Sequence, residues 1–129
     1  MNLDLLFLEV NNLEESLAFY IGQLGFKVER KTLDSEPPIA TLRAGNLRIT
    51  LAQQFETMLR RGRGVHFFIG VPDVDALYRQ LRERGVIVDS PVDEGWGGRF
   101  ITVIDPDKYR FFFVTWTECH AAEGSVTNK

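Results

Sequence analysis

The sequence predicts an α+β fold in which two βαβββ modules form a curved, mostly antiparallel sheet around a cavity, with the helices outside. Three observations support this prediction. A strand, a helix and three further strands occur in this order twice, with a period of about 60 residues. One such module would leave a whole face of its sheet exposed, so two modules together make the stable arrangement. The 129 residues suffice for one domain with a core but not for two independent domains.

The first module spans residues 3–54 and begins with a short apolar strand. A helix follows, because Asn12 is a typical N-cap, Glu15 can complete its capping box and Gly25 can end it. Four side chains recur at helical spacing and form its buried stripe: Leu13, Leu17, Tyr20 and Leu24. Strands are expected at residues 3–10, 27–33, 39–45 and 46–53, with a Pro-containing turn at 34–38.

The second module spans residues 65–116 and repeats this order, so that residues 5–10 correspond to residues 66–71. Its helix is capped by Asp73 and ended by Gly85. The apolar stripe of this helix consists of Val74, Leu77, Tyr78 and Leu81. The helix is expected at residues 72–85, and the strands at 65–71, 86–92, 99–105 and 108–116.

The remaining residues and the overall charge narrow the range of partners. Residues 55–64 are basic and predict a linker, and residues 117–129 are small and polar and predict a frayed tail. A net charge of −3 disfavours nucleic acid, which needs a concentrated basic face. No apolar run approaches the roughly 20 residues that span a bilayer, so no membrane partner is expected. A single cysteine, Cys119, and the absence of a secretory signal indicate a cytoplasmic protein.

Three stretches resemble a known family: VNNLEESLAFYIGQLGF at residues 10–26, VPDVDALYRQLRERGV at residues 71–86, and VIDPDKYRFFF at residues 103–113. They are similar to the vicinal oxygen chelate superfamily, which contains glyoxalases, extradiol dioxygenases and bleomycin resistance proteins. The resemblance covers almost all of residues 3–116. It implies a small-molecule ligand and a homodimer, but the superfamily spans several activities, and a fold alone does not decide between them.

A divalent metal divides the activities of this superfamily. The resemblance implies four ligand positions, one on the first strand and one on the last strand of each module. In this sequence they hold Leu5, Thr50, His66 and Phe112. Two of these side chains are hydrocarbons, which cannot donate an electron pair to a cation. We therefore expect no metal site, no cofactor and no metal-dependent glyoxalase or dioxygenase activity.

His66 has three interpretations. It is a half-buried polar side chain with a local hydrogen-bond partner, a cavity-wall donor or acceptor for an organic ligand, or a ligand to a metal that a partner chain completes. Its strand position points it toward the place where the resemblance puts the metal.

The side chains that share a face with these positions make up the expected ligand site. Strand side chains alternate, so positions two residues apart lie on one face. The expected ligand-binding residues are His66, Phe68, Phe112, Phe7, Arg48, Thr50, Arg110 and Thr102. If the DPDK turn has three residues, Thr102 faces Phe112. Phe100 then faces Val114. Such an aromatic wall would bind a flat ligand by stacking, although Phe at alternate positions also fits an ordinary core.

The stretch DEGWGGRF at residues 93–100 adds Trp96 and Arg99 to the expected ligand-binding residues. An indole in a glycine-rich loop is costly to expose unless it packs or stacks. The stretch resembles the Trp–Gly loop of the bleomycin resistance group, in which aromatic side chains near a dimer crevice hold a cationic glycopeptide. The resemblance implies that Trp96 contacts the ligand, and anchoring of the loop is the alternative. Arg99 binds an anionic group or pairs with Asp93 or Glu94.

The turn DPDK at residues 105–108 departs from the resembled pattern, which is Asp-Pro-Asp-Gly. Gly adopts a positive φ at the fourth position, and another residue does so at a cost of about 1 kcal/mol. Lys108 is therefore expected to adopt a positive φ or to change the turn type.

These observations favour a metal-free small-molecule binding protein of the glyoxalase/bleomycin resistance type. It would sequester an aromatic or cationic antibiotic-like ligand in the cavity of a homodimer, which needs a shaped aromatic surface and no catalytic residue. The alternative is a lyase or isomerase of the same superfamily that works without a metal or with an unusual one. Glu9 or His66 would act as the base in such an enzyme. Arg48 or Arg110 would hold the oxyanion.

Overall fold

The fold is seen in a computed structural model that describes residues 1, 3–54, 65–94 and 97–116. The predictions about the linker at 55–64, about Trp96 and about the tail at 117–129 lie outside the described residues. The chain divides into two units: Met1–Arg63 with Asp105–Tyr109, and Gly64–Ile104 with Arg110–Lys129. No helix in the described part of the chain is long and apolar enough to cross a membrane.

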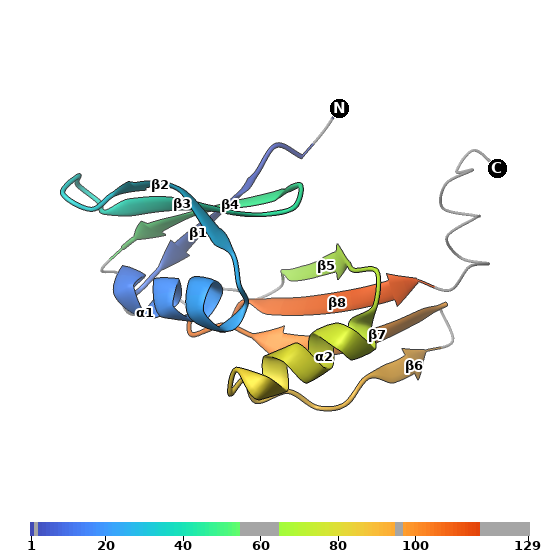
Figure 1. Cartoon of the computed structure of the whole chain (residues 1–129). Coiled ribbons are helices and arrows are strands. Elements are labelled where there is room, and N and C mark those ends of the chain that lie inside the picture. Colours follow the sequence, from blue (N-terminus) through green and yellow to red (C-terminus); the bar gives the residue numbers. More distant parts are fainter. Residues whose placement is uncertain (2, 55–64, 95–96, 117–129) are drawn as a thin grey trace. The chain divides into compact units, whose positions relative to one another are not determined.

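The first unit contains one βαβββ module. Its elements are β1 (Leu6–Val10), α1 (Leu13–Leu17), the π-helix η1 (Ala18–Gln23), β2 (Lys27–Thr32), β3 (Ile39–Ala44) and β4 (Leu47–Gln53). The strands form a sheet in the order β1-β4-β3-β2, with β1 parallel to β4 and the other pairs antiparallel. The first helix packs on β4 and lies on one side of this sheet (Figure 1).

The second unit contains the same module again. Its elements are β5 (His66–Gly70), α2 (Val74–Glu83), β6 (Val92–Glu94), β7 (Gly98–Ile104) and β8 (Arg110–Trp116). The strand order is β5-β8-β7-β6, with β5 parallel to β8 and the other pairs antiparallel. Helix α2 packs on β7 and β8 (Figure 1). The matching order in the two units confirms the two βαβββ modules that the repeat predicts.

The residues predicted to cap the two helices do so, although α2 is two residues shorter at each end than the expected range of 72–85. Asn12 Oδ1 accepts a hydrogen bond from the N–H of Glu15 at 2.9 Å. The side chain of Asp73 accepts hydrogen bonds from two N–H groups of the first turn of α2, both at 3.1 Å. Gly25 and Gly85, beyond the two C-termini, have φ values of 84° and 83°, which favour glycine.

The first helix continues as a π-helix, which the sequence pattern does not predict. The N–H of Leu24 donates to the carbonyl of Phe19 at 3.0 Å, five residues earlier. The wider turn buries both Phe19 and Tyr20, which are 8% and 0% exposed. Their rings meet edge to face with centroids 5.1 Å apart. The π-helix therefore buries one more aromatic ring than the predicted helical stripe contains.

The predicted strand at residues 86–92 is wrong for most of its length, because β6 covers only Val92–Glu94. Two valines of this stretch are buried, while Ile87 between them is 98% exposed. Burial thus alternates along this stretch, as it does in a strand. Residues 86–91 nevertheless form no ladder, and pairing with β7 begins only at Val92. Alternate burial here reflects packing of an extended segment, not membership of the sheet.

Each sheet has one face covered by its helix and one face that we call its open face. The covered face of the first sheet includes Leu42, Ile49 and Leu51, all 0% exposed. The covered face of the second sheet includes Ile101, Val103 and Phe111, each at most 1% exposed. Burial of a side chain of this size stabilises the fold by about 1.5–3 kcal/mol, so these faces form the core. The residues between them in each strand point to the open faces.

The turn Asp105–Tyr109 joins β7 to β8 along the chain but belongs to the first unit. There the hydroxyl of Tyr20 donates to Asp105 Oδ2 at 2.7 Å. The other carboxylate oxygen of Asp105 accepts from the N–H groups of Asp107 and Tyr109, at 2.9 and 2.7 Å. Asp105 is 2% exposed and Asp107 is 6% exposed. Asp105 is thus a buried carboxylate whose two oxygens are both hydrogen-bonded.

Burial also controls ionisation in this cluster. It raises the pKa of Asp105 to about 6, against the hydrogen bonds from Tyr20 and from the turn, which lower it. Burial and the nearby carboxylates also raise the pKa of the Tyr20 hydroxyl above its usual value. Tyr20 therefore keeps its proton and remains a donor to Asp105 throughout the neutral range.

Lys108 adopts the positive φ that its place in the turn predicts, with a φ of 74°. The turn also keeps the predicted register. Thr102 lies opposite Phe112, and Phe100 lies opposite Val114. The strain at Lys108 therefore leaves the pairing of β7 with β8 intact.

Candidate ligand-binding site

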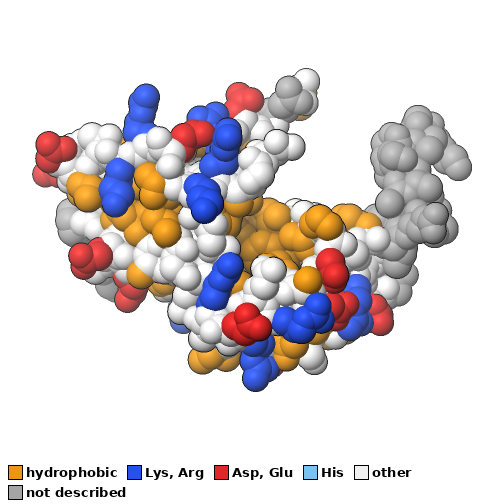
Figure 2. All heavy atoms as spheres, viewed as in Figure 1, with side chains coloured by type: hydrophobic (Ala, Val, Ile, Leu, Met, Phe, Trp, Pro, Cys, Tyr) orange, Lys and Arg blue, Asp and Glu red, His pale blue; other side chains and the backbone are white. Residues whose placement is uncertain are grey.

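The open face of the second sheet carries a cluster that we call the aromatic face: His66 and Phe68 of β5, Phe100 of β7 and Phe112 of β8. Phe112 lies at its centre and stacks on Phe68, with centroids 4.7 Å apart and 19° between the ring planes. His66 and Phe100 each lie with centroids 5.6 Å from that of Phe112. Phe68 is 53% exposed, and hydrophobic side chains gather over β5 and β8 in Figure 2. The cluster therefore offers an exposed surface for stacking.

Charged side chains mark the two ends of the aromatic face. At one end, Arg110 of β8 lies directly across from His66 of β5. At the other end, the register places Glu94 of β6 opposite Gly98, which in turn lies opposite Trp116. A flat ligand on this face would therefore meet a cation at one end and a carboxylate at the other.

Phe100 of the aromatic face, and Trp116 on the same open face, are absent from the predicted ligand-binding residues. Trp116 lies four residues after Phe112, so strand alternation places both on one face. Its Nε1 lies 3.8 Å from where a Cβ at Gly70 would be, so the indole sits close to that glycine. Phe100 lies two residues before Thr102 and follows the same rule. The period-two pattern therefore contained the signal for both.

Phe7, Arg48 and Thr50 lie in the first unit, on the open face of its own sheet. Phe7 lies directly across from Thr50 and is 56% exposed. Thr50 is 7% exposed, and its hydroxyl oxygen lies 2.9 Å from that of Thr41. Arg48 donates from Nε to Glu29 Oε1 at 3.0 Å. These three predicted residues share the open face of the first sheet.

Arg99 lies on neither open face, and its predicted role in ligand binding stays a prediction. Its Nε and Nη2 donate to the two carboxylate oxygens of Asp75 at 3.0 and 2.9 Å. Its Nη1 donates to Asp93 at 3.1 Å, the pairing that the sequence offered as one alternative. The hydrogen bonds to Asp75 and Asp93 raise the pKa of Arg99, and the bond from Arg99 lowers the pKa of Asp75. Strand alternation next to Phe100 turns Arg99 toward α2, where it joins the helix to β6 and β7.

The four positions where the resemblance implies metal ligands do not fit a metal. Leu5 and Phe112 have no electron pair to offer, and the hydroxyl of Thr50 is engaged with Thr41. His66 is exposed beside Phe112, so the interpretation of a half-buried side chain is wrong. Among the residues that the structure describes, no three His, Cys, Asp or Glu side chains are placed to hold a metal ion. The donor set at these positions therefore supports no metal-dependent step.

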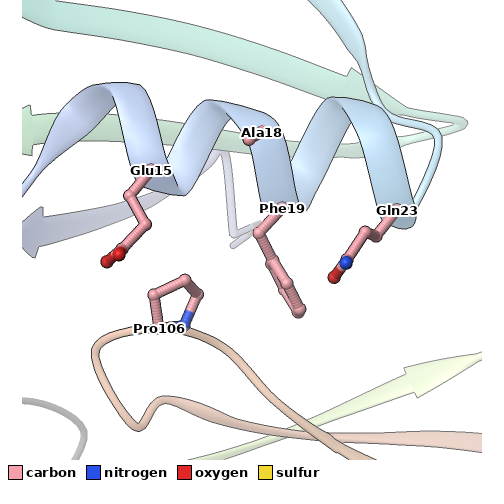
Figure 3. Close-up of a pocket in the computed structure, with 5 residues that line it drawn as sticks. All are labelled: Glu15, Ala18, Phe19, Gln23 and Pro106. Atoms are coloured by element: carbon pink, nitrogen blue, oxygen red, sulfur yellow. The ribbon is translucent and has the colours of Figure 1, made fainter. Parts of the chain in front are cut away.

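A hollow of about 380 Å³ lies beside the first helix. Figure 3 shows Glu15, Phe19 and Gln23 pointing from the helix toward Pro106 of the turn. The hollow offers one carboxylate and one amide beside a ring that is only 8% exposed. It therefore presents far less stacking surface than the aromatic face.

The βαβββ module order of this chain agrees with that of a known superfamily. The model of the Glyoxalase/Bleomycin resistance protein/Dioxygenase superfamily matches residues 2–113. The chain therefore belongs to this superfamily. A comparison with curated proteins finds no match.

Solved structures share the same fold. The chain is similar to TnmS3, an antibiotic binding protein from Streptomyces sp. CB03234, with 25% identity, 91% of this chain and 97% of that chain covered, and a TM-score of 0.74. It is also similar to a glyoxalase/bleomycin resistance protein from the same Streptomyces. The identity is 27%, 84% of this chain and 96% of that chain are covered, and the TM-score is 0.67. The fold also matches that of a glyoxalase/bleomycin resistance protein/dioxygenase from Nocardioides. The identity is 22%, 92% of this chain and 85% of that chain are covered, and the TM-score is 0.72. These similarities confirm the α+β fold.

Proposed function

We propose that this protein binds an aromatic, antibiotic-like small molecule on the aromatic face and sequesters it unchanged. The observation that carries this proposal is the exposed stack of Phe68 on Phe112, with centroids 4.7 Å apart and Phe68 53% exposed. A ligand ring that joins such a stack gains about 0.5–1.5 kcal/mol beyond the burial of its area. Glu94 at one end of the face suits a ligand that carries a positive group there.

The similarity to TnmS3, an antibiotic binding protein, supports an antibiotic as the ligand class. The homodimer expected from the sequence remains part of the proposal. An exposed face binds a ligand from one side only, whereas sequestration needs a covered ligand, and a second copy supplies the cover. Sedimentation of the ligand-bound protein should therefore give a dimer. A species of 14.8 kDa under these conditions would contradict this part of the proposal.

The test of binding is a titration with bleomycin and with ethidium, a flat cationic dye, followed by tryptophan fluorescence. The chain has two tryptophans, so the Trp96→Phe variant reports from Trp116 alone. Phe68→Ala in this background should weaken binding roughly tenfold, the equivalent of one lost stacking contact. The control is Ile87→Ala, since Ile87 is 98% exposed and lies outside the strands of the sheet. Fluorescence that responds to neither compound, or equal affinities for Phe68→Ala and Ile87→Ala, would contradict the proposal.

A second candidate function is a lyase or isomerase that works without a metal, and one observation favours it. His66 and Arg110 are direct cross-strand neighbours, so a base and a cation lie side by side. Mass spectrometry of the ligand after incubation separates the two candidates. A binding protein returns the ligand with its mass and structure unchanged. A product that forms with the parent chain but not with His66→Gln would support the enzyme instead.

A further inference from the structure

The open face of the first sheet carries a concentration of positive charge. Three side chains are direct cross-strand neighbours and are called the cationic row: Lys27 of β2, Arg43 of β3 and Arg48 of β4. Arg30 lies in the next row, opposite Thr41. These side chains point away from the helix, because Leu42, which alternates with them, is 0% exposed on the covered face. Lys and Arg side chains gather over β2, β3 and β4 in Figure 2.

One carboxylate balances these charges within the two rows. Glu29 sits at an irregularity of β2, where the register shifts, and accepts from Nε and Nη2 of Arg48 at 3.0 and 2.5 Å. Its other oxygen lies 3.7 Å from Nη1 of Arg43. Lys27 and Arg30 form no ion pair within the described part of the chain. Four cations thus share one carboxylate, in a chain whose net charge is −3.

The neighbouring positive charges of the cationic row repel one another in the protein alone, and a bound anion would reduce this repulsion. Like charges that face each other across neighbouring strands destabilise a sheet, and Arg43 faces both Lys27 and Arg48. A guanidinium presents a planar fork of donors that matches the oxygens of a carboxylate or a phosphate. The paired hydroxyls of Thr41 and Thr50, 2.9 Å apart, lie in the next row and add a neutral donor. An oxyanion bound here would relieve the repulsion and gain directed hydrogen bonds.

There is room for a ligand beside the cationic row. A hollow of about 600 Å³ is lined by Lys27, Glu29 and Arg43, by Val28, and by the small residues Gly25, Ala44 and Gly45. Two members of the cationic row, Lys27 and Arg43, thus line this hollow together with Glu29. An anionic group can therefore reach the row from solvent.

We propose that the cationic row is a second ligand site, which binds the anionic oxygens of a small molecule that carries a phosphate or a carboxylate. Glu29 is its built-in counterion. The oxyanion takes the place of Glu29 on Arg48 and Arg43, and Glu29 turns away into solvent. The cationic row lies within the first unit and takes an anionic group, so its test does not depend on the outcome for the aromatic face.

The experiment is an NMR titration of the full chain with inorganic phosphate and, separately, with malonate, each at constant ionic strength. The Nε–Hε signals of Arg43 and Arg48 and the amide signals of β2 and β3 should shift and saturate. Sodium chloride at the same ionic strength should leave them in place. The anion with the lower Kd identifies which oxyanion the site prefers. Shifts that do not saturate with either anion would overturn the proposal.

Three variants test the role of each charge. Arg43→Gln should weaken anion binding roughly tenfold, the effect of one lost charged hydrogen bond. Glu29→Gln should strengthen it, because the competing carboxylate is gone. Lys31→Gln is the matched control on the same strand, since Lys31 lies opposite the buried Ala40 and therefore points to the other face. Equal weakening by Arg43→Gln and Lys31→Gln, or weaker binding in Glu29→Gln, would overturn the proposal.

Discussion

Asp105 is a single carboxyl group that couples folding to pH. Its pKa is raised from the ordinary value of 3.8 to about 6, chiefly by burial. A raised pKa means that the folded state holds this proton more tightly than the unfolded state does. Protonation of Asp105 therefore stabilises the folded state. This contribution to the free energy of unfolding is complete below the unfolded pKa of 3.8 and is lost as the pH rises through about 6.

We expect the contribution of Asp105 to the free energy of unfolding to increase by about 1 kcal/mol when the pH is lowered from 7.5 to 5. Urea denaturation at the two pH values measures the change. Asp105→Asn cannot take up the proton, so the difference between the parent chain and this variant isolates the contribution. If both proteins show the same change with pH, another group is responsible.

At the scale of the elements, the two modules use the same contact to hold the helix to the sheet. Gln53 Oε1 at the end of β4 accepts from the N–H of Leu13 at 2.7 Å. Thr115 Oγ1 near the end of β8 accepts from the N–H of Val74 at 2.8 Å and donates to the carbonyl of Val71 at 3.0 Å. In each module, the last strand thus satisfies an N–H group at the first turn of the helix.

Thr115→Val removes both of these hydrogen bonds and keeps the shape of the side chain. We expect it to lower the free energy of unfolding by about 1–3 kcal/mol, because a buried N–H and a carbonyl lose their partner. Thr102→Val is the control, since this threonine lies on the open face beside Phe112, and a change within about 0.5 kcal/mol is expected. Similar losses in urea denaturation of the two variants would refute a specific role of Thr115.

The elements that follow local rules are those that the sequence predicts. Asn12 and Asp73 cap helices through their own side chains, and Gly25 ends a helix through its own φ. The π-helix depends on Phe19 and Tyr20 both reaching the interior, which a helical period of 3.6 residues does not anticipate. Strand β6 begins only at Val92, where pairing with β7 begins. The local sequence pattern does not contain the position of β7.

The same distinction applies to the candidate site. Alternation along β5 and β8 predicts that His66, Phe68 and Phe112 share a face, and the structure brings their rings together. Alternation also puts Arg99 on the face opposite Phe100, but its partner there, Asp75, is 24 residues away on a helix and cannot be read from the strand. Residues on one strand are related by geometry that the sequence carries. Pairs between a helix and a strand are set by packing.

At the scale of the whole molecule, the first unit is completed by a segment of the second half of the chain. The turn Asp105–Tyr109 is held at both ends by β7 and β8 of the second unit. Within the first unit, it supplies the carboxylate that accepts from Tyr20 at 2.7 Å. Loss of either unit therefore removes support from the other, and the two units should unfold together.

Tyr20→Phe tests this coupling. The variant loses the hydrogen bond to the buried Asp105, and we expect the free energy of unfolding to fall by about 1–3 kcal/mol. Native-state hydrogen exchange should show the same fall for amides of β4, in the first unit, and of β8, in the second. Faster exchange confined to β4 would show that the units open separately.

The shared turn has a consequence for how such a chain can evolve. A duplication produces two copies of a module. Recombination can exchange such copies between genes when each copy folds and functions by itself. Here a recombination event between the two halves would separate Tyr20 from Asp105. Each residue would then lose its hydrogen-bond partner. Exchange of one half alone therefore costs the stability that this hydrogen bond supplies, which favours inheritance of the two modules together.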